Sequence, residues 1–218
     1  VDSILISQNA STGTLSSASS NTGLGDTVFS ALTSGDFNTA VGFKALEDHT
    51  TGASNTAIGA QALMNNTTAA NNVAVGISAL KTNTTGASNT AVGKNALDVN
   101  TTASNNTAVG ADSLGANTTA NNNVAVGYHA LLSNTTGAEN TAVGSLALDA
   151  NSTGANNVAM GHGALSGNTT ASNNTAIGMF GLLSNTTGAN NVAVGTNALN
   201  DNTTASNNTS IGKSSSAA

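Results

Sequence analysis

A glycine recurs at every seventeenth residue through most of this 218-residue chain. If that glycine is position 0 of a repeat, there are twelve copies without insertion or deletion, at Gly25, Gly42, Gly59, Gly76, Gly93, Gly110, Gly127, Gly144, Gly161, Gly178, Gly195 and Gly212. A short, fixed period is typical of solenoids, in which each repeat packs only on its neighbours. The period therefore restricts the fold to a stack of like units, and directs the search for function to a repeated surface.

Each repeat is too short for two packed helices, because helical repeats need about 33 to 47 residues. Its segment Thr-Ala-Val-Gly instead favours a short strand bounded by Asn and Gly, both of which are turn residues. We therefore predict an all-β fold, a parallel β-solenoid over residues 21–212. Residues 1–20 are interpreted as an irregular N-terminal cap or linker with one short strand at 4–6, and residues 213–218 as a C-terminal linker or truncated end.

Three further rows of residues recur in register with the glycine. Position −4 is Asn in all twelve copies, position −1 is aliphatic or Met, and position +4 is Leu in all but the first complete copy. These rows include Asn38, Asn55, Asn72 and Asn89; Val41, Val75 and Val92; and Leu46, Leu63 and Leu80. In a parallel, in-register stack, Asn side chains hydrogen-bond from one coil to the next. We expect ladders at −4 and at +7, where Asn also predominates.

Alternation along a strand places positions −3 and −1 on one face and positions −2 and 0 on the other. The aliphatic −1 row is expected to face the inside of the coil. The opposite face carries Ala at −2 and the glycines, such as Gly42, Gly59, Gly76 and Gly93, and is expected to form a smooth contact strip. One Val and one Leu per coil give only about 3–6 kcal/mol of burial. We therefore expect an obligate oligomer that associates along the small-residue strip or the Leu row.

The block Asn-Asn-Val-Ala-Val-Gly at 71–76 and 190–195, with Asn-Asn-Val-Ala-Met-Gly at 156–161, resembles a known motif. It is similar to the core repeat of YadA-like heads of trimeric autotransporter adhesins, although these units are longer than the family's. The array also resembles repeats in phage tail fibres. The resemblance implies a left-handed β-roll, a homotrimer, and an extracellular place on a cell surface or a virion fibre.

The composition argues against several classes of function. Charged residues make up 6% of the chain, the net charge is −6, and all four basic residues are lysines. Because phosphate binding depends on clustered basic residues, we do not expect a nucleic-acid partner. The chain has no Cys, which excludes disulfides and thiolate metal sites, and no apolar run of the ~20 residues that span a membrane.

The acidic and histidine residues do not form a catalytic or metal-binding pattern. Asp98 and Asp149 share position +5 but lie three coils apart, and His49, His129 and His162 occupy three different repeat positions. Paired carboxylates or clustered imidazoles would be needed for acid–base chemistry or metal binding. We predict no enzyme activity, no cofactor and no metal.

The sequence favours a structural or adhesive fibre segment that binds a host surface, glycan or matrix ligand through many weak contacts. The best contact candidates are Tyr128, His129, Met179 and Phe180, although such large groups also pack between chains. One alternative is a passive shaft or filament without a receptor. A second alternative is ice binding, against which the adjacent Thr-Thr pairs argue, because neighbouring residues of a strand point to opposite faces.

Overall fold

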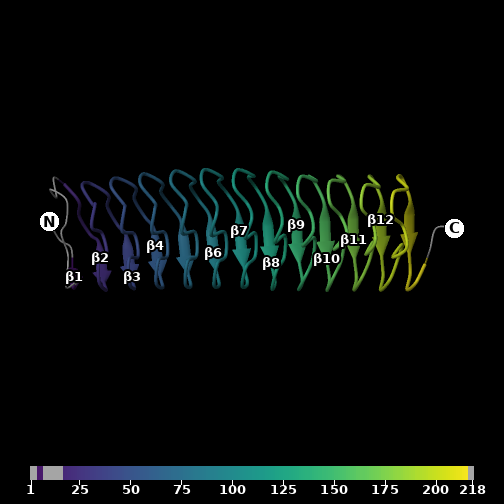
Figure 1. Ribbon diagram of the computed structural model, residues 1–218, viewed down its shortest axis with the longest axis horizontal. Helices are drawn as coiled ribbons and strands as arrows, with labels where there is room; N and C mark the ends of the chain where they lie inside the picture. Colours follow the sequence, from purple (N-terminus) through teal and green to yellow (C-terminus); the bar gives the residue numbers. More distant parts are fainter. Residues whose placement is uncertain (1–3, 7–16, 216–218) are drawn as a thin grey trace. The chain divides into compact units, whose positions relative to one another are not determined.

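The computed structural model describes residues 4–6 and 17–215, and the regular secondary structure in these residues is entirely β-strand. The chain divides into two compact units, Val1–Asn106 and Thr107–Ala218. Each unit is a parallel β-solenoid in which every 17-residue coil contributes one three-residue strand (Figure 1). The predicted fold class is thus confirmed. The boundary between the units falls inside the array, where the sequence shows no break.

The first unit contains six strands that stack in chain order. They are β1 (Ile4–Ile6), β2 (Thr22–Leu24), β3 (Thr39–Val41), β4 (Thr56–Ile58), β5 (Val73–Val75) and β6 (Thr90–Val92). The short strand expected at 4–6 is present and pairs in parallel with β2. Because neighbouring strands align residue for residue, Val41 lies opposite Ile58 and every repeat position forms a straight row.

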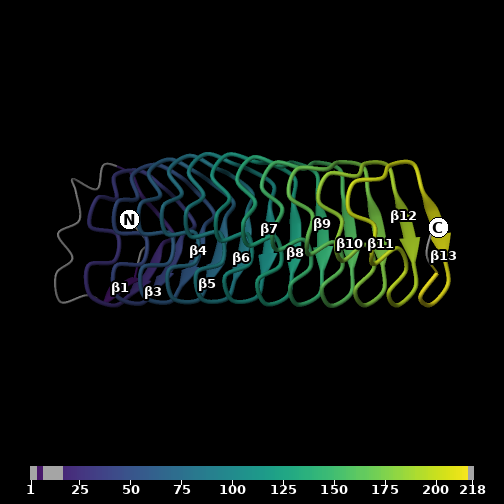
Figure 2. The ribbon, with the colours of Figure 1, turned by 45° about the vertical axis from the view of Figure 1, so that its right-hand side comes forward.

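The second unit repeats this arrangement with seven strands. They are β7 (Thr107–Val109), β8 (Val124–Val126), β9 (Thr141–Val143), β10 (Val158–Met160), β11 (Thr175–Ile177), β12 (Val192–Val194) and β13 (Thr209–Ile211). In both units a long loop continues each strand and returns to the start of the next one (Figure 2). These loops are built of turns, in which the N–H at +7 donates to the carbonyl at +4, as in Asn66 to Leu63 at 3.1 Å.

The glycine at position 0 is required by the stacking of coils. Its φ lies between 124° and 141° in all twelve copies, a region that residues with a side chain rarely adopt. A Cβ added to Gly59 would lie 2.5 Å from the carbonyl oxygen of Gly76 in the next coil. The glycine therefore lets one coil approach the next closely enough for the strand to hydrogen-bond.

Three more positions adopt left-handed backbone, and they hold non-glycine residues in nearly every coil. In one coil these are Ser54, Gln61 and Leu63, with φ of 60°, 61° and 49°. Left-handed geometry costs a non-glycine residue roughly 1–2 kcal/mol. The cost at +4 is offset because Leu63 is fully buried and its N–H donates to the carbonyl of Ala79 at 3.0 Å.

The interior of most coils is filled by alanine at −2 and +3 and by leucine at +4, as in Ala40, Ala45 and Leu46, all 0% exposed. The first coil shows how tightly these positions are matched. There Gly23 replaces the −2 alanine, and Val28 and Phe29 replace the smaller residues at +3 and +4. A Cβ on Gly23 would lie 3.1 Å from Phe29 Cδ2. The three positions thus share one volume, since cores fill space at crystal-like density.

Two buried asparagine ladders link the coils inside this core. In the −4 row, the backbone N–H of Asn55 donates to Asn38 Oδ1 at 2.9 Å, and Asn55 Nδ2 donates to the Ala69 carbonyl at 2.9 Å. In the +7 row, Asn100 Nδ2 donates to Asn83 Oδ1 at 2.8 Å and to the Ala103 carbonyl at 3.0 Å. Each loop carbonyl therefore accepts from both ladders, as the Ala69 carbonyl does from Asn55 and Asn66, which stabilises the stack.

The expectation that the aliphatic −1 row faces inward is wrong. Val41, Val75 and Val92 are partly exposed, whereas Ala40 and Asn38 on the other face are buried. Asparagine must lie inside to reach the loop carbonyls, and the strand's alternation then turns position −2 inward and −1 outward. The interior beside leucine has room only for alanine, so the larger aliphatic residues lie outside.

The expected contact strip of alanine and glycine is wrong for the same reason. The −2 alanines are enclosed within their own coil, and the glycines, including Gly42, Gly76 and Gly93, have the left-handed backbone of the coil junction. Nor is the leucine row available to another chain, because Leu46 and Leu80 are 0% exposed. Any association between copies must therefore use other residues.

Candidate functional site

The outward side of the strands is the most extensive candidate surface. We define the outward strand face of a unit as the side chains at positions −3 and −1 of its strands. In the first unit, complete coils contribute Thr39, Val41, Thr56, Ile58, Val73, Val75, Thr90 and Val92. In the second unit they are Thr107, Val109, Val124, Val126, Thr141, Val143, Val158, Met160, Thr175, Ile177, Val192 and Val194.

This face is rich in methyl groups, regular and free of charge. Position −3 is Thr or Val and position −1 is Val, Ile, Leu or Met throughout the array, so no ionisable side chain interrupts it. Ile58 and Ile177 are each 40% exposed. With strands about 4.8 Å apart, seven three-residue strands present roughly 300 Å². Apolar patches of that size on a soluble protein commonly mark interaction sites.

Tyr128 and His129 form a rigid pair on the loop that follows β8. Their rings stack with centroids 3.7 Å apart and planes 18° apart. His129 Nε2 lies 3.8 Å from Asp112 Oδ2, and Tyr128 remains 53% exposed. Stacking limits the rotamers of both rings, so contact with a ligand would cost little side-chain entropy. The pair is well placed for a surface contact.

Met179 and Phe180 differ in their surroundings although they are adjacent. Met179 is 46% exposed. Phe180 instead lies edge-on to His162, at 5.1 Å between centroids, and covers Gly163, where an added Cβ would meet Phe180 Cδ1 at 2.7 Å. Phe180 is therefore engaged in packing between its own coils, and Met179 is the member of this pair that is available to a ligand.

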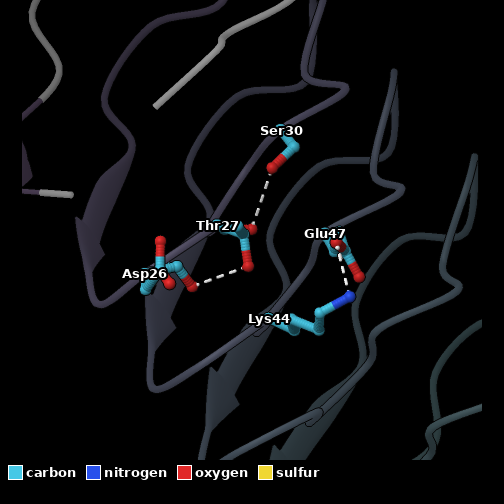
Figure 3. Close-up of polar contacts among 5 residues, drawn as sticks. All are labelled: Asp26, Thr27, Ser30, Lys44 and Glu47. Carbon is cyan, nitrogen blue, oxygen red and sulfur yellow. Dashed lines mark hydrogen bonds and ion pairs between the residues drawn. The ribbon is translucent and has the colours of Figure 1, made fainter. Parts of the chain in front are cut away.

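The charged groups of the first coils make local contacts on the loop surface. Lys44 Nζ lies 3.0 Å from Glu47 Oε1, Thr27 Oγ1 donates to the Asp26 carbonyl at 2.8 Å, and Ser30 Oγ donates to the Thr27 carbonyl at 3.0 Å (Figure 3). Such partly exposed ion pairs contribute little to stability. These contacts order the loop but do not bring two acidic groups together.

Asp149 is a partly buried carboxylate of the second unit. Its Oδ1 is buried without a hydrogen-bond partner. Burial raises the pKa of the Asp149 carboxyl, and its backbone hydrogen bonds and the positive charge of His129 partly offset that effect. Burying a carboxylate in this way costs stability when the group is charged.

Within residues 4–6 and 17–215, no three or more His, Asp or Glu side chains are grouped so that they could hold a metal ion. The same residues contain no helix that is long and apolar enough to cross a membrane.

Comparison with known proteins found no matching family model, no matching curated protein and no matching solved structure. The class that the structure defines is therefore a class of fold, a β-solenoid repeat protein built from 17-residue coils. The likeness of residues 71–76 to YadA-like head repeats remains a resemblance of motif.

Sequence reasoning missed the outward strand face, although the sequence held one signal for it. The first coil is the only one with glycine at −2, and it is also the only one with Phe at +4 and Val at +3. In this coil a smaller residue, Gly23, accompanies two larger ones, Val28 and Phe29. Such compensation in size indicates that −2 and +4 share the interior. The −1 row must then face outward.

Proposed function

We propose that this chain is a segment of an extracellular fibre in which copies associate through the outward strand face as a homotrimer. The observation that supports the proposal is the uncharged row of Val, Ile and Thr along this face in each unit. The more apolar side of every strand is the side that its own coil leaves uncovered. Aliphatic side chains normally find burial, so a partner surface is expected.

A second copy is the partner that best fits this surface. The face is flat, repeats in register and has no charges that would require a complementary partner, as in the core of interfaces between identical chains. Fully burying one Val or Ile contributes about 1.5–3 kcal/mol, so even partial burial of one row in many coils adds up. The trimeric state follows the resemblance of residues 71–76 and 156–161 to heads of trimeric adhesins.

Adhesion is proposed to use the loops that follow the strands. Tyr128 and Met179 are exposed on the loops of the second unit, as Phe37, Phe43 and Ile77 are on those of the first. In a trimer each contact occurs three times, and weak contacts then reinforce one another through multivalency. A passive shaft is the alternative. Tyr128→Ser, Met179→Ser and the double variant should reduce attachment to a target surface if the loops bind it, and unchanged attachment by the folded assembly would favour the shaft.

Light scattering tests the association directly. We expect a solution mass near three times the 21.0 kDa of one chain. The double variant Val143→Lys with Ile177→Lys places charges on the outward strand face and should give a folded monomer. The matched control is Thr136→Lys with Thr170→Lys, because these threonines are exposed at position +9 and lie outside the face. A compact wild-type monomer would contradict the proposal.

Ice binding is a second candidate function, and one observation favours it. The outward strand face carries Thr-x-Val or Thr-x-Ile in many coils, as at Thr39 and Val41, so hydroxyls and methyl groups repeat at regular spacings. The adjacent Thr-Thr pairs do not supply this pattern. The two candidates compete for the same surface, so a trimer that buries it should show no thermal hysteresis. A monomer with thermal hysteresis that Thr56→Lys abolishes would favour ice binding.

A further inference from the structure

His49 occupies a place in the +7 ladder where the other repeats after the first coil have asparagine. Its side chain is 0% exposed, and its ring lies 6.4 Å from the ring of Phe29. In the preceding coil the same position is Leu32, which has no polar group in its side chain. His49 is therefore the first polar member of this ladder in the first unit.

The two ring nitrogens of His49 perform both tasks of the asparagine they replace. Nε2 lies 2.7 Å from the Gly52 carbonyl, and Nδ1 lies 3.1 Å from Asn66 Nδ2. Because a carbonyl can only accept and an amide nitrogen donates, Nε2 carries the hydrogen and Nδ1 accepts. Asn83 likewise donates to its own loop carbonyl, that of Gly86, and accepts from the next coil. The neutral imidazole thus mimics the amide.

A protonated imidazole does not fit this place. A hydrogen on Nδ1 would point at Asn66 Nδ2, which is itself a donor. Rotating the Asn66 amide does not solve the conflict, because Nδ2 also donates to the Ala69 carbonyl at 3.1 Å and Oδ1 accepts from Asn83 Nδ2 at 3.4 Å. In the rotated amide, Asn66 Oδ1 would face the Ala69 carbonyl oxygen, and Asn66 Nδ2 would face Asn83 Nδ2. In the +7 ladder each Nδ2 donates to the side chain of the preceding coil, so His49 must supply an acceptor. Protonation of His49 would remove that acceptor.

The surroundings supply no charge to compensate an imidazolium. The closest acidic residues along the chain are Asp36, Glu47 and Asp48. Asp36 accepts hydrogen bonds from Ser19, Glu47 pairs with Lys44 and Asp48 is exposed. The ring lies near Phe29 in the preceding coil and hydrogen-bonds Asn66 in the next one, and both side chains are neutral. Burial lowers the pKa of His49, and its hydrogen bonds offset this only in part.

We propose that His49 is an acid-sensitive link that opens the amino-terminal coils of the first unit in mild acid. In the unfolded chain His49 takes up a proton at its ordinary pKa near 6.5. The imidazole binds this proton less tightly in the folded coil, so the unfolded state binds more protons once the pH falls below about 6.5. Stability is therefore complete above this pH, falls as the pH decreases, and levels off below the folded-state pKa.

Native-state hydrogen exchange of the full chain between pH 7.5 and 5.5 tests the proposal. After correction for intrinsic rates, amides in residues 42–66 should lose protection by up to about tenfold per pH unit below 6.5, which corresponds to uptake of one proton. His49→Asn restores the common residue of the row and should remove this loss. The control His162→Asn changes an exposed histidine at position +1 and should leave the loss unchanged.

Two results would overturn the proposal. One is wild-type protection in residues 42–66 that does not change between pH 7.5 and 5.5. The other is His49→Asn protein that keeps the full acid sensitivity. An NMR titration of the imidazole in the wild-type protein gives a measurement that does not depend on how any variant folds. His49 should remain the neutral Nε2–H form below pH 6.5, where a free imidazole is charged, and titration of the His49 ring at its ordinary pKa would contradict the proposal.

Discussion

The two sides of each short strand follow different rules. On the inner side, Asn72 and Ala74 are 0% exposed, and their rows hold Asn in every copy and Ala in nearly every copy. On the outer side, Val73 and Val75 are partly exposed, and their rows accept Thr or Val and Val, Ile, Leu or Met. The inner rows are restricted by hydrogen-bond geometry and a small fixed volume. The outer rows require only a shape that suits an extended strand.

This difference shows that hydrophobicity alone identifies the wrong side of the strand as the core. The outer rows are the more apolar ones, yet the coil closes around alanine and asparagine. A buried amide is tolerated because its hydrogen bonds are complete, as they are for Asn55 and Asn72. The apolar outer rows then remain for a surface function, which the following changes are designed to test.

The largest effect is expected from Gly127→Val. The new Cβ would lie 2.5 Å from the Gly144 carbonyl oxygen, on a backbone with φ of 138°. Neither neighbour can move without breaking the stack, so we expect a loss above about 4 kcal/mol, enough to unfold the coils of the second unit. Circular dichroism and thermal unfolding measure it. Ser145→Val, one residue beyond the next glycine, is the control, and a stable Gly127→Val protein would contradict the role of the glycine.

The next effect is expected from Asn72→Ala in the −4 ladder. The change leaves the Asn89 N–H buried without its partner and removes one of the two donors to the Gly86 carbonyl, which keeps its hydrogen bond from Asn83 Nδ2. An orphaned buried donor costs about 1–3 kcal/mol and a lost hydrogen bond about 0.5–1.5 kcal/mol, so unfolding by denaturant should show a destabilisation of roughly 1.5–4.5 kcal/mol. Asn71→Gly alters the exposed neighbour, whose backbone is already left-handed, and should change stability by less than about 1 kcal/mol. Equal effects at both positions would argue against the ladder.

Exchanging residue types between the adjacent positions −2 and −1 tests which side of the strand faces the core. Ala74→Val adds two methyl groups to the filled interior and should destabilise the first unit by about 1–3 kcal/mol. Val75→Ala removes the same groups from the outer row and should cost a folded monomer less than about 1 kcal/mol. The comparison needs monomeric protein, obtained with the charged outward-face variant as background. A reversed order would mean that the −1 row is the core.

The smallest effect concerns Asp149. Because burial raises the pKa of this carboxyl, the folded state holds the proton more tightly than the unfolded state. Stability therefore decreases as the pH rises from the ordinary pKa of aspartate to the raised value, and Asp149→Asn should remove that decrease. Melting temperatures between pH 4 and pH 7 measure it, with the exposed Asp48→Asn as control. An identical pH profile in the wild type and Asp149→Asn would contradict the burial cost.

The period of seventeen, the strand at Thr-Ala-Val-Gly and the asparagine rows were readable from the sequence, because a parallel in-register stack multiplies every local preference. Within the candidate site, Tyr128 and His129 were named and lie together. Phe180 was named as well, but its ring is engaged with His162 and Gly163. Contacts between coils decide such cases, and a single repeat does not reveal which of its large side chains will cover a neighbour.

The sequence by itself determined that this chain is a stack of 17-residue β coils with a glycine at each junction. Only the tertiary structure decided which side of the strand is inside. Alternation along a strand places the −2 and −1 rows on opposite faces, but it does not say which face is the core. The assignment depends on the closed coil, where Asn38 must reach the Gly52 carbonyl and Leu46 leaves room only for alanine. Those constraints connect residues whose loops meet only after the coil has closed.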